Sequence, residues 1–117
     1  MVVSHPHYFS TTCEWAKAFN CPVYLSVEDA EWVMRKTEGV KLWEGKTLEL
    51  LDGEFVAIKT GGHFPGSSVL LWESQRKLFV ADTIAVVPSG INHVNRPPGT
   101  ISFSFMWSYP NLVSYQC

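Results

Sequence analysis

The spacing of apolar residues in the first third of the chain predicts two short helices with a buried strand between them. Thr11 or Thr12 can cap the first helix. The apolar face of this helix would comprise Trp15, Ala16 and Phe19. Cys21-Pro22 ends it, because proline cannot continue a helix. The next three residues, Val23-Tyr24-Leu25, are then expected to form a short strand in the core.

A capping-box-like signal, Ser26-x-x-Asp29, predicts the start of the second helix. The apolar stripe of this helix would comprise Ala30, Val33 and Met34. Beyond Gly39, apolar and polar residues alternate, which predicts antiparallel strands. The expected strands cover residues 47–51, 55–59, 68–72, 77–81 and 101–107. Asp52-Gly53 predicts a hairpin turn between the first two of them.

Two loops rich in turn-forming residues interrupt these strands. They are Gly61–Gly66 and Pro88–Thr100, and the second contains His93. The chain shows no repeat, low-complexity tract or linker, so residues 1–117 are expected to form a single domain. The order of elements predicts an α+β (mixed α/β) fold with two helices and an antiparallel sheet.

The amino-acid composition excludes several kinds of protein. The chain has 117 residues, of which 46% are hydrophobic and 17% charged, enough apolar material for one packed core. The net charge of −2 gives no electrostatic footprint for nucleic acid. Three cysteines without C-x-x-C spacing argue against a disulfide-stapled secreted module. With no signal peptide and no apolar run long enough to span a membrane, we expect a soluble, cytoplasmic protein that binds neither nucleic acid nor membrane.

Three separate positions could carry metal chemistry. His5-x-His7 places two imidazoles on one face if this segment is extended. His63 lies in the glycine-rich loop, which can fold tightly and place an imidazole at a strand end. Asp82 follows an apolar run, where a carboxylate is as often a turn cap as a metal ligand. For each of the histidines, the structural alternative is a side chain that faces solvent.

Taken together and in order, these positions resemble the motifs of the metallo-β-lactamase superfamily. The resemblance is strongest to fungal-type metallo-β-lactamase-like proteins, and it runs over nearly the whole chain. The segments that carry it are His5–Tyr8, Glu14–Ala16, Cys21–Leu25, Gly61–Ser68 and Ala81–Thr83.

The resemblance implies a zinc site. His5 and His7 would match the first two histidines of H-x-H-x-D-H, and His63 would match the histidine of G-H-x-x-G-S. These three would bind one zinc ion, and Asp82 would match the carboxylate that bridges two metals. The implied fold is an αβ/βα sandwich of two sheets flanked by helices. The implied chemistry is hydrolysis of a small ester, thioester or lactam by a metal-bound hydroxide.

The chain departs from the family pattern at the second metal. Phe9 and Ser10 stand where H-x-H-x-D-H has its aspartate and last histidine. Cys13 or Glu14 could replace them only if the start of the first helix turned these side chains inward. One zinc ion is therefore expected rather than two. The family also has strands before H-x-H and a later region that carries a further histidine, so residues 1–117 are expected to be a partial domain that lacks the N- and C-terminal parts of the fold.

Two functional hypotheses follow from this resemblance. In the first, the chain is a zinc-dependent hydrolase of a small-molecule substrate, in which Asp82 accepts a hydrogen bond from the attacking water or holds a weak second metal. In the second, it is a degenerate or truncated domain that binds metal without catalysis. In either case, incompletely covered sheet edges are expected to favour self-association. The residues expected on such uncovered faces are Trp32, Trp43, Trp72 and Trp107; the alternative is that these aromatic side chains fill a small, compact core.

A cupin-like metal-binding barrel is a minor alternative. Pro88-x-Gly90-x-x-His93-x-Asn95 resembles the second cupin motif, although cupins space the histidine and asparagine one residue wider. The first cupin motif requires a glutamate soon after H-x-H, and Glu14 lies too far from His7. Two helices before the strands also fit a pure barrel poorly.

Overall fold

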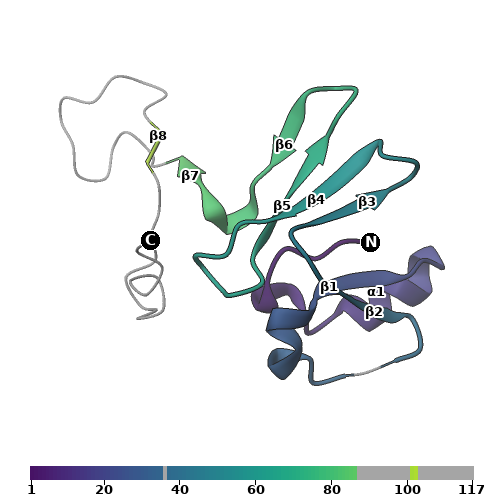
Figure 1. The fold of residues 1–117 in the computed structure, drawn as a ribbon. Coiled ribbons are helices and arrows are strands. Elements are labelled where there is room, and N and C mark those ends of the chain that lie inside the picture. The colour runs from purple at the N-terminus through teal and green to yellow at the C-terminus, as the bar shows by residue number, and fades with distance from the viewer. Residues whose placement is uncertain (36, 87–100, 103–117) are drawn as a thin grey trace.

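In the computed structural model of the chain, the described residues are 1–35, 37–86 and 101–102. Their first half begins with the 3-10 helix η1 and the α-helix α1, and continues with a strand, a second 3-10 helix and another strand. In order, these elements are η1 (Pro6–Tyr8), α1 (Thr12–Phe19), β1 (Val23–Ser26), η2 (Val27–Trp32) and β2 (Val40–Trp43). Strands β1 and β2 pair in parallel, with Val23 opposite Val40 (Figure 1).

The second half is built from antiparallel strands. These elements are β3 (Thr47–Leu50), β4 (Phe55–Lys59), β5 (Ser68–Trp72), β6 (Lys77–Phe79), the 3-10 helix η3 (Ala81–Thr83), β7 (Ala85–Val86) and β8 (Ile101–Ser102). Strands β3 to β6 form one sheet in sequence order, and β7 pairs with β8. Parallel and antiparallel sheets together with helices confirm the predicted mixed fold class.

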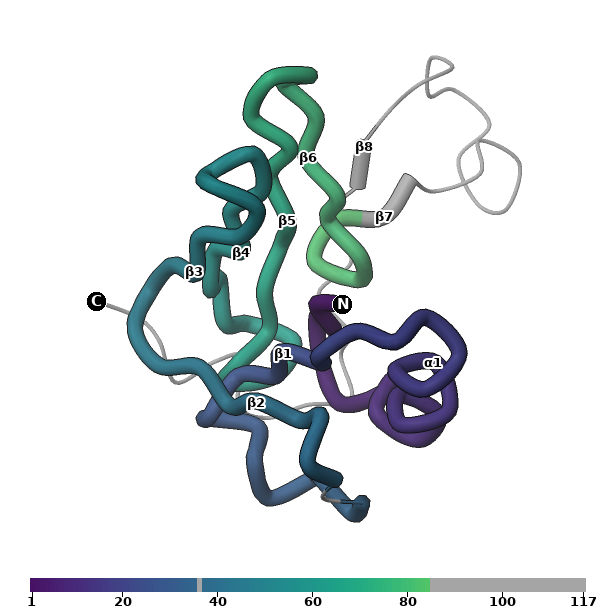
Figure 2. Tube along the Cα trace, turned by 90° about the vertical axis from the view of Figure 1, so that its right-hand side faces the viewer, coloured from purple at the N-terminus to yellow at the C-terminus, as the bar shows by residue number. Residues whose placement is uncertain are grey.

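The N-terminal segment connects the two main sheets. The amide of Val3 donates to the carbonyl of Tyr24 on β1, at 3.2 Å. The amide of Ser68 on β5 donates to the carbonyl of Ser4, at 2.9 Å. Both views place this segment between the β3–β6 sheet and the β1–β2 pair (Figure 1, Figure 2). The buried core beside it comprises Val3, Phe9, Val23 and Leu25.

The predicted strands agree closely with those observed. The hairpin at Asp52-Gly53 is confirmed, although its loop covers residues 51–54 and β3 ends at Leu50 rather than residue 51, because Leu51, Asp52 and Gly53 all have positive φ. Strand β6 ends at Phe79 rather than residue 81, because Ala81 adopts a φ of 46° and begins η3. Of the strand expected at 101–107, residues 101 and 102 form β8, and 103–107, with Trp107, lie outside the described residues. The loop Pro88–Thr100, with its cupin-like motif and His93, also lies outside them.

The first helix is confirmed, but two of the three residues of its predicted apolar face are wrong. Trp15 and Phe19 are 53% and 65% exposed, and they stack on each other at the surface. The third, Ala16, packs against the core, and the helix buries Thr12 and Cys13. Thr12 Oγ1 donates to the carbonyl of Phe9 at 2.9 Å, which ties the start of the helix to the core.

The second helix is shorter and tighter than predicted. It is the 3-10 helix η2, and the chain turns extended at Val33, with φ −81° and ψ 90°. Ser26 donates its hydroxyl to Glu28 rather than capping the backbone, and Met34 is exposed. With the capping residue engaged elsewhere, a longer α-helix has no N-terminal anchor.

Three tryptophans that were expected on uncovered faces are more buried than the sequence predicted. Trp43 is buried, with the ammonium of Lys59 held 4.5 Å from its ring centre, whereas Trp32 and Trp72 are half-buried. Strand β2, which contains Trp43, was not among the predicted strands. It covers one edge of β1 by pairing with it in parallel. Self-association through sheet edges stays a prediction. Over the described ranges, no helix has the length and apolar character needed to cross a membrane.

Candidate metal centre

In the H-x-H motif, His5 precedes a tight turn and His7 lies within it. His5 occupies the position before η1 with an extended backbone, and Pro6 begins the turn, a position that its fixed φ favours. The segment is therefore not extended over both histidines, which was the condition for placing them on one face. The two rings still meet, edge to face, with centroids 5.1 Å apart. Ser4 Oγ lies 2.9 Å from His5 Nδ1, which leaves Nε2 of the same ring as the atom that faces the site.

His63 reaches the same place from the glycine-rich loop. Gly61 and Gly62 both have positive φ, of 64° and 88°, which lets the chain fold back sharply before the histidine. Ser67 then closes the loop, because its hydroxyl accepts from the amide of Phe64 at 2.8 Å. As a result, His63 Nε2 lies 3.4 Å from His7 Nδ1.

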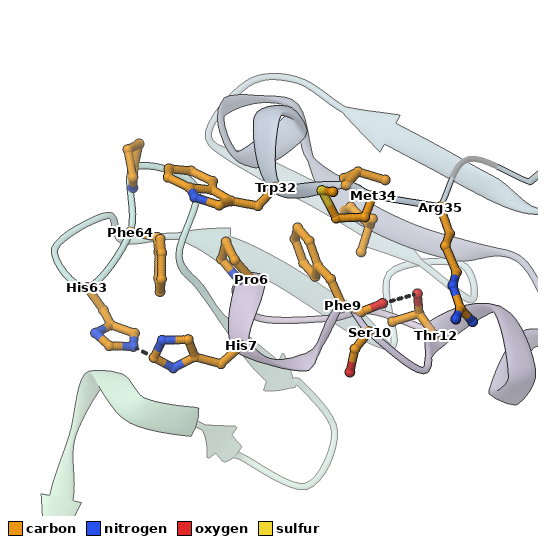
Figure 3. Close-up of a pocket in the computed structure, with 13 residues that line it drawn as sticks. Pro6, His7, Phe9, Ser10, Thr12, Trp32, Met34, Arg35, His63 and Phe64 are labelled. Atoms are coloured by element: carbon orange, nitrogen blue, oxygen red, sulfur yellow. Dashed lines mark hydrogen bonds between the residues drawn. The ribbon is translucent and has the colours of Figure 1, made fainter.

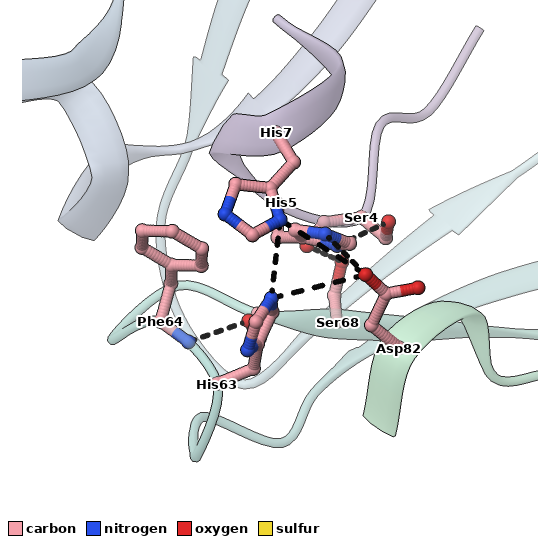
Figure 4. A network of polar contacts seen from close by, with 8 residues as sticks. Ser4, His5, His7, His63, Phe64, Ser68 and Asp82 are labelled. Carbon is pink, nitrogen blue, oxygen red and sulfur yellow. Dashed lines mark hydrogen bonds and ion pairs between the residues drawn. The ribbon is translucent and has the colours of Figure 1, made fainter. Parts of the chain in front are cut away.

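Asp82 completes the cluster from η3. Its Oδ2 atom lies 3.3 Å from His5 Nε2, 4.0 Å from His7 Nδ1 and 3.9 Å from His63 Nε2 (Figure 4). The possible ligand atoms of these four residues all lie within 4.8 Å of one another. The structure thus brings together the four residues that the family resemblance implied as metal ligands, from three segments of the chain.

Burial favours the neutral form of two histidines of this cluster, His5 and His63. His5 is only 2% exposed, and its burial lowers the pKa of the ring to about 4, against the opposing attraction of Asp82. The pKa of His63 is also lowered, by burial and then by the neighbouring His7, and Asp82 again opposes the shift. Neutral imidazole is the form that binds a metal ion.

The donor set fits a divalent metal ion. His5 Nε2 is buried without a hydrogen-bond partner, although Asp82 Oδ2 lies 3.3 Å away, because that contact lacks hydrogen-bond geometry. A buried polar nitrogen of this kind costs free energy unless something satisfies it. Three imidazole nitrogens and one carboxylate oxygen are ligands typical of zinc and related metals.

The residues at the expected second-metal positions do not join this cluster. Phe9 is buried in the core, and Ser10 is exposed. The two suggested replacements are engaged elsewhere: Cys13 Sγ contacts the carbonyl of Arg35, and Glu14 pairs with the Arg35 guanidinium at 2.6 Å. In the part of the chain that the structure describes, the cluster has four members.

Sequence reasoning missed how the His63 loop is held in place. Asp29, interpreted as part of a helix start, is 1% exposed and accepts from the amide of Gly66 at 2.8 Å. Gly66 packs so tightly that an added Cβ would lie 2.5 Å from Ser26 and 2.7 Å from the Asp29 carboxyl carbon. The density of glycines in the loop was the available signal for this close approach, whereas nothing local marked Asp29 as its partner.

Phe64 is a second feature that the sequence did not indicate. Its ring is 8% exposed and contacts the rings of His5, His7 and His63, with centroids 5.9, 5.0 and 4.9 Å away. The same ring meets Trp32 edge to face at 5.2 Å. Phe64 therefore forms one wall of the cluster.

Comparisons with known proteins agree with this geometry. No family model matches the chain. It is 40% identical to the "Uncharacterized protein YmaE" of Bacillus subtilis (strain 168), over 97% of this chain and 39% of that protein. The chain thus spans about two fifths of the length of this curated relative.

A solved structure of TMB-1, a metallo-β-lactamase, matches 76% of this chain and 43% of its own, with a TM-score of 0.62 and 22% identity. The described residues therefore have a metallo-β-lactamase-like fold, which confirms the resemblance seen in the sequence at the level of the fold.

The close packing at Gly66 gives a first prediction. Gly66→Ala should lower the free energy of unfolding by about 1–3 kcal/mol, because the new methyl group overlaps Ser26 and Asp29. Gly39→Ala is the matched control, since nothing lies within 4 Å of a Cβ at that position. Chemical denaturation followed by circular dichroism measures both. Equal stability of the two variants would show that the loop does not pack as described.

The burial of Asp29 gives a second prediction, on pH. Burial raises the pKa of this carboxyl from 3.8 to about 6, so the folded chain holds a proton that the unfolded chain releases between these values. Its contribution to stability is therefore present at pH 4 and lost as the pH rises through 6. Relative to Asp29→Asn, the wild type should lose roughly 2–3 kcal/mol of unfolding free energy between pH 4 and pH 8. Parallel stability curves for the two chains would contradict this.

Proposed function

We propose that this chain is the zinc-binding part of a metallo-β-lactamase-like hydrolase, with a single zinc ion held by His5, His7 and His63. The observation that supports this most directly is the convergence of three imidazoles and one carboxylate within 4.8 Å, on a fold shared with a metallo-β-lactamase. Asp82 is the proposed catalytic residue. The substrate is a small molecule with an acyl carbonyl, such as an ester, a thioester or a lactam.

Each residue of the cluster has a distinct part in this proposal. The three histidines supply nitrogen ligands, and the Ser4 hydroxyl at Nδ1 orients the ring of His5. A zinc ion bound there would lower the pKa of a water ligand and polarise the substrate carbonyl. Asp82 is 37% exposed, so solvent can reach it, and its Oδ2 faces the histidines. This oxygen is placed to accept the proton of the attacking water.

A single metal is favoured by the two residues that follow the H-x-H motif. Phe9 contributes an apolar ring to the core, and Ser10 offers a weakly coordinating hydroxyl. The same observation supports the alternative of a non-catalytic metal-binding domain, because the family aspartate at the position of Phe9 also orients the attacking water. Metal content and hydrolysis therefore need separate tests.

Zinc content tests the metal site. After refolding with zinc and exhaustive dialysis, the wild type should retain about one zinc ion per chain, and His63→Ala should bind zinc at least about 100-fold more weakly, because one ligand is lost. His93→Ala is the control, since this histidine is a ligand only in the cupin alternative. Elemental analysis measures zinc, and circular dichroism shows that each sample is folded.

Two outcomes would contradict the metal site. Absence of zinc from a folded wild type would exclude it for this chain. Loss of zinc in His93→Ala with retention in His63→Ala would favour the cupin-like alternative.

Hydrolysis tests the catalytic part of the proposal. The zinc-loaded wild type should hydrolyse a 4-nitrophenyl ester, and a chelator should abolish this activity. Asp82→Asn, assayed at saturating zinc, should lower kcat by about 10²–10⁴-fold, because the proton acceptor is lost while three nitrogen ligands remain. Unchanged kcat in Asp82→Asn would remove Asp82 from the mechanism. A zinc-loaded wild type without esterase activity would favour the non-catalytic alternative.

A further inference from the structure

A cavity of about 520 Å³ lies beside the metal cluster and shares two of its residues. His7 and His63 line it on one side, as Figure 3 shows. This volume lies within the range of small-molecule sites in proteins. A ligand in the cavity would therefore reach the histidines without any rearrangement of the chain.

The wall of the cavity nearest the cluster is aromatic and fixed. Phe64 lies beside the two histidines in this wall, with its ring at 88° to that of His7 and 82° to that of His63. Trp32 continues this wall by an edge-to-face contact with Phe64 (Figure 3). Phe9 and Leu25, both buried, also line the cavity. These side chains offer apolar contact over most of the surface.

Polar groups lie at the margin of the cavity rather than inside it. Arg35 lines the cavity, but its side chain is 65% exposed and its guanidinium is paired with Glu14 at 2.6 Å. Thr12 donates its hydroxyl to the carbonyl of Phe9. Arg35 is the only lysine, arginine, aspartate or glutamate among the described lining residues, and its charge is paired, so the cavity suits a neutral, apolar group.

We propose that this cavity binds the apolar acyl group of the substrate and presents the adjoining carbonyl to His7 and His63. This inference rests on the proposed hydrolase function and specifies its substrate class. The substrates are esters or thioesters whose acyl group is an aryl ring or a chain of several carbons, in preference to acetyl esters and to acyl groups that carry a charge.

The reaction balances with water as the only co-reactant. For an ester, the water oxygen bonds to the acyl carbon, and the bond between that carbon and the alcohol oxygen breaks. Asp82 Oδ2 takes the proton from water and returns it to the departing alcohol oxygen. The products are the carboxylic acid and the alcohol.

Binding of an amide that resists hydrolysis tests the cavity independently of catalysis. Each methylene removed from water should strengthen binding about fourfold if fully buried, so hexanamide should bind at least about tenfold more tightly than acetamide. Ligand-observed NMR on both the metal-free and the zinc-loaded chain measures this ratio. Intermolecular nuclear Overhauser contacts from the hexanamide methyl group should reach the rings of Trp32 and Phe64.

A pair of tryptophan variants tests the position of the ligand. Trp32→Ala should reduce the preference for hexanamide at least about fivefold, because it removes part of the wall. Trp72→Ala is the matched control, since Trp72 is also half-buried but stacks on Phe55 in the four-stranded sheet. If Trp32→Ala does not fold, the wild-type contacts to Trp32 and Phe64 decide the location on their own.

Ester hydrolysis then links the cavity to the reaction. For the zinc-loaded chain, kcat/KM for 4-nitrophenyl hexanoate should exceed that for the acetate at least about tenfold, and Trp32→Ala should reduce this ratio. Binding of hexanamide without hydrolysis would support the cavity and refute the proposed function. Hydrolysis with equal kcat/KM for both esters, or hexanamide binding no tighter than acetamide, would overturn the proposed acyl site.

Discussion

The hydrogen bond from the amide of Gly66 to the buried carboxylate of Asp29 is the contact on which the cluster of three histidines and Asp82 depends. This hydrogen bond fixes the far end of the loop that carries His63 against η2, the 3-10 helix that follows β1. The near end is fixed by Ser67, whose carbonyl accepts from the amides of Thr60 and Gly61. Because both ends of the loop are held, the imidazole of His63 contacts that of His7, although the two residues are 56 positions apart in the chain.

This arrangement is costly, and the cost is concentrated around the site. Asp29 Oδ2 and His5 Nε2 are both buried without hydrogen-bond partners. Burial raises the pKa of Asp29 and lowers the pKa of His5, and both shifts favour the uncharged form. Ala81 adopts a positive φ immediately before Asp82, a conformation uncommon outside glycine. Unfavourable features of this kind persist where surrounding packing determines the structure, and they are concentrated at functional sites.

The sequence was sufficient to predict the elements with strong local signals. Asp52-Gly53 specified a hairpin, and the ordered histidine and aspartate motifs identified the four members of the cluster. The errors concern relations between segments. The spacing of Trp15 and Phe19 indicates a helix face but not which partner it would meet, and these rings lie at the surface. Neither the parallel pairing of β2 nor the contact between Asp29 and Gly66 has a signature in neighbouring residues, because both depend on tertiary structure.

The N-terminal segment has a consequence for cooperativity. Its backbone bonds to Tyr24 on one sheet and to Ser68 on the other, and the next residue along the chain is His5. Opening of this segment would separate the sheets and remove a ligand in the same event. A metal ion bound at His5 would therefore help to hold the two sheets together. Release of the metal and separation of the sheets would then occur as one cooperative event.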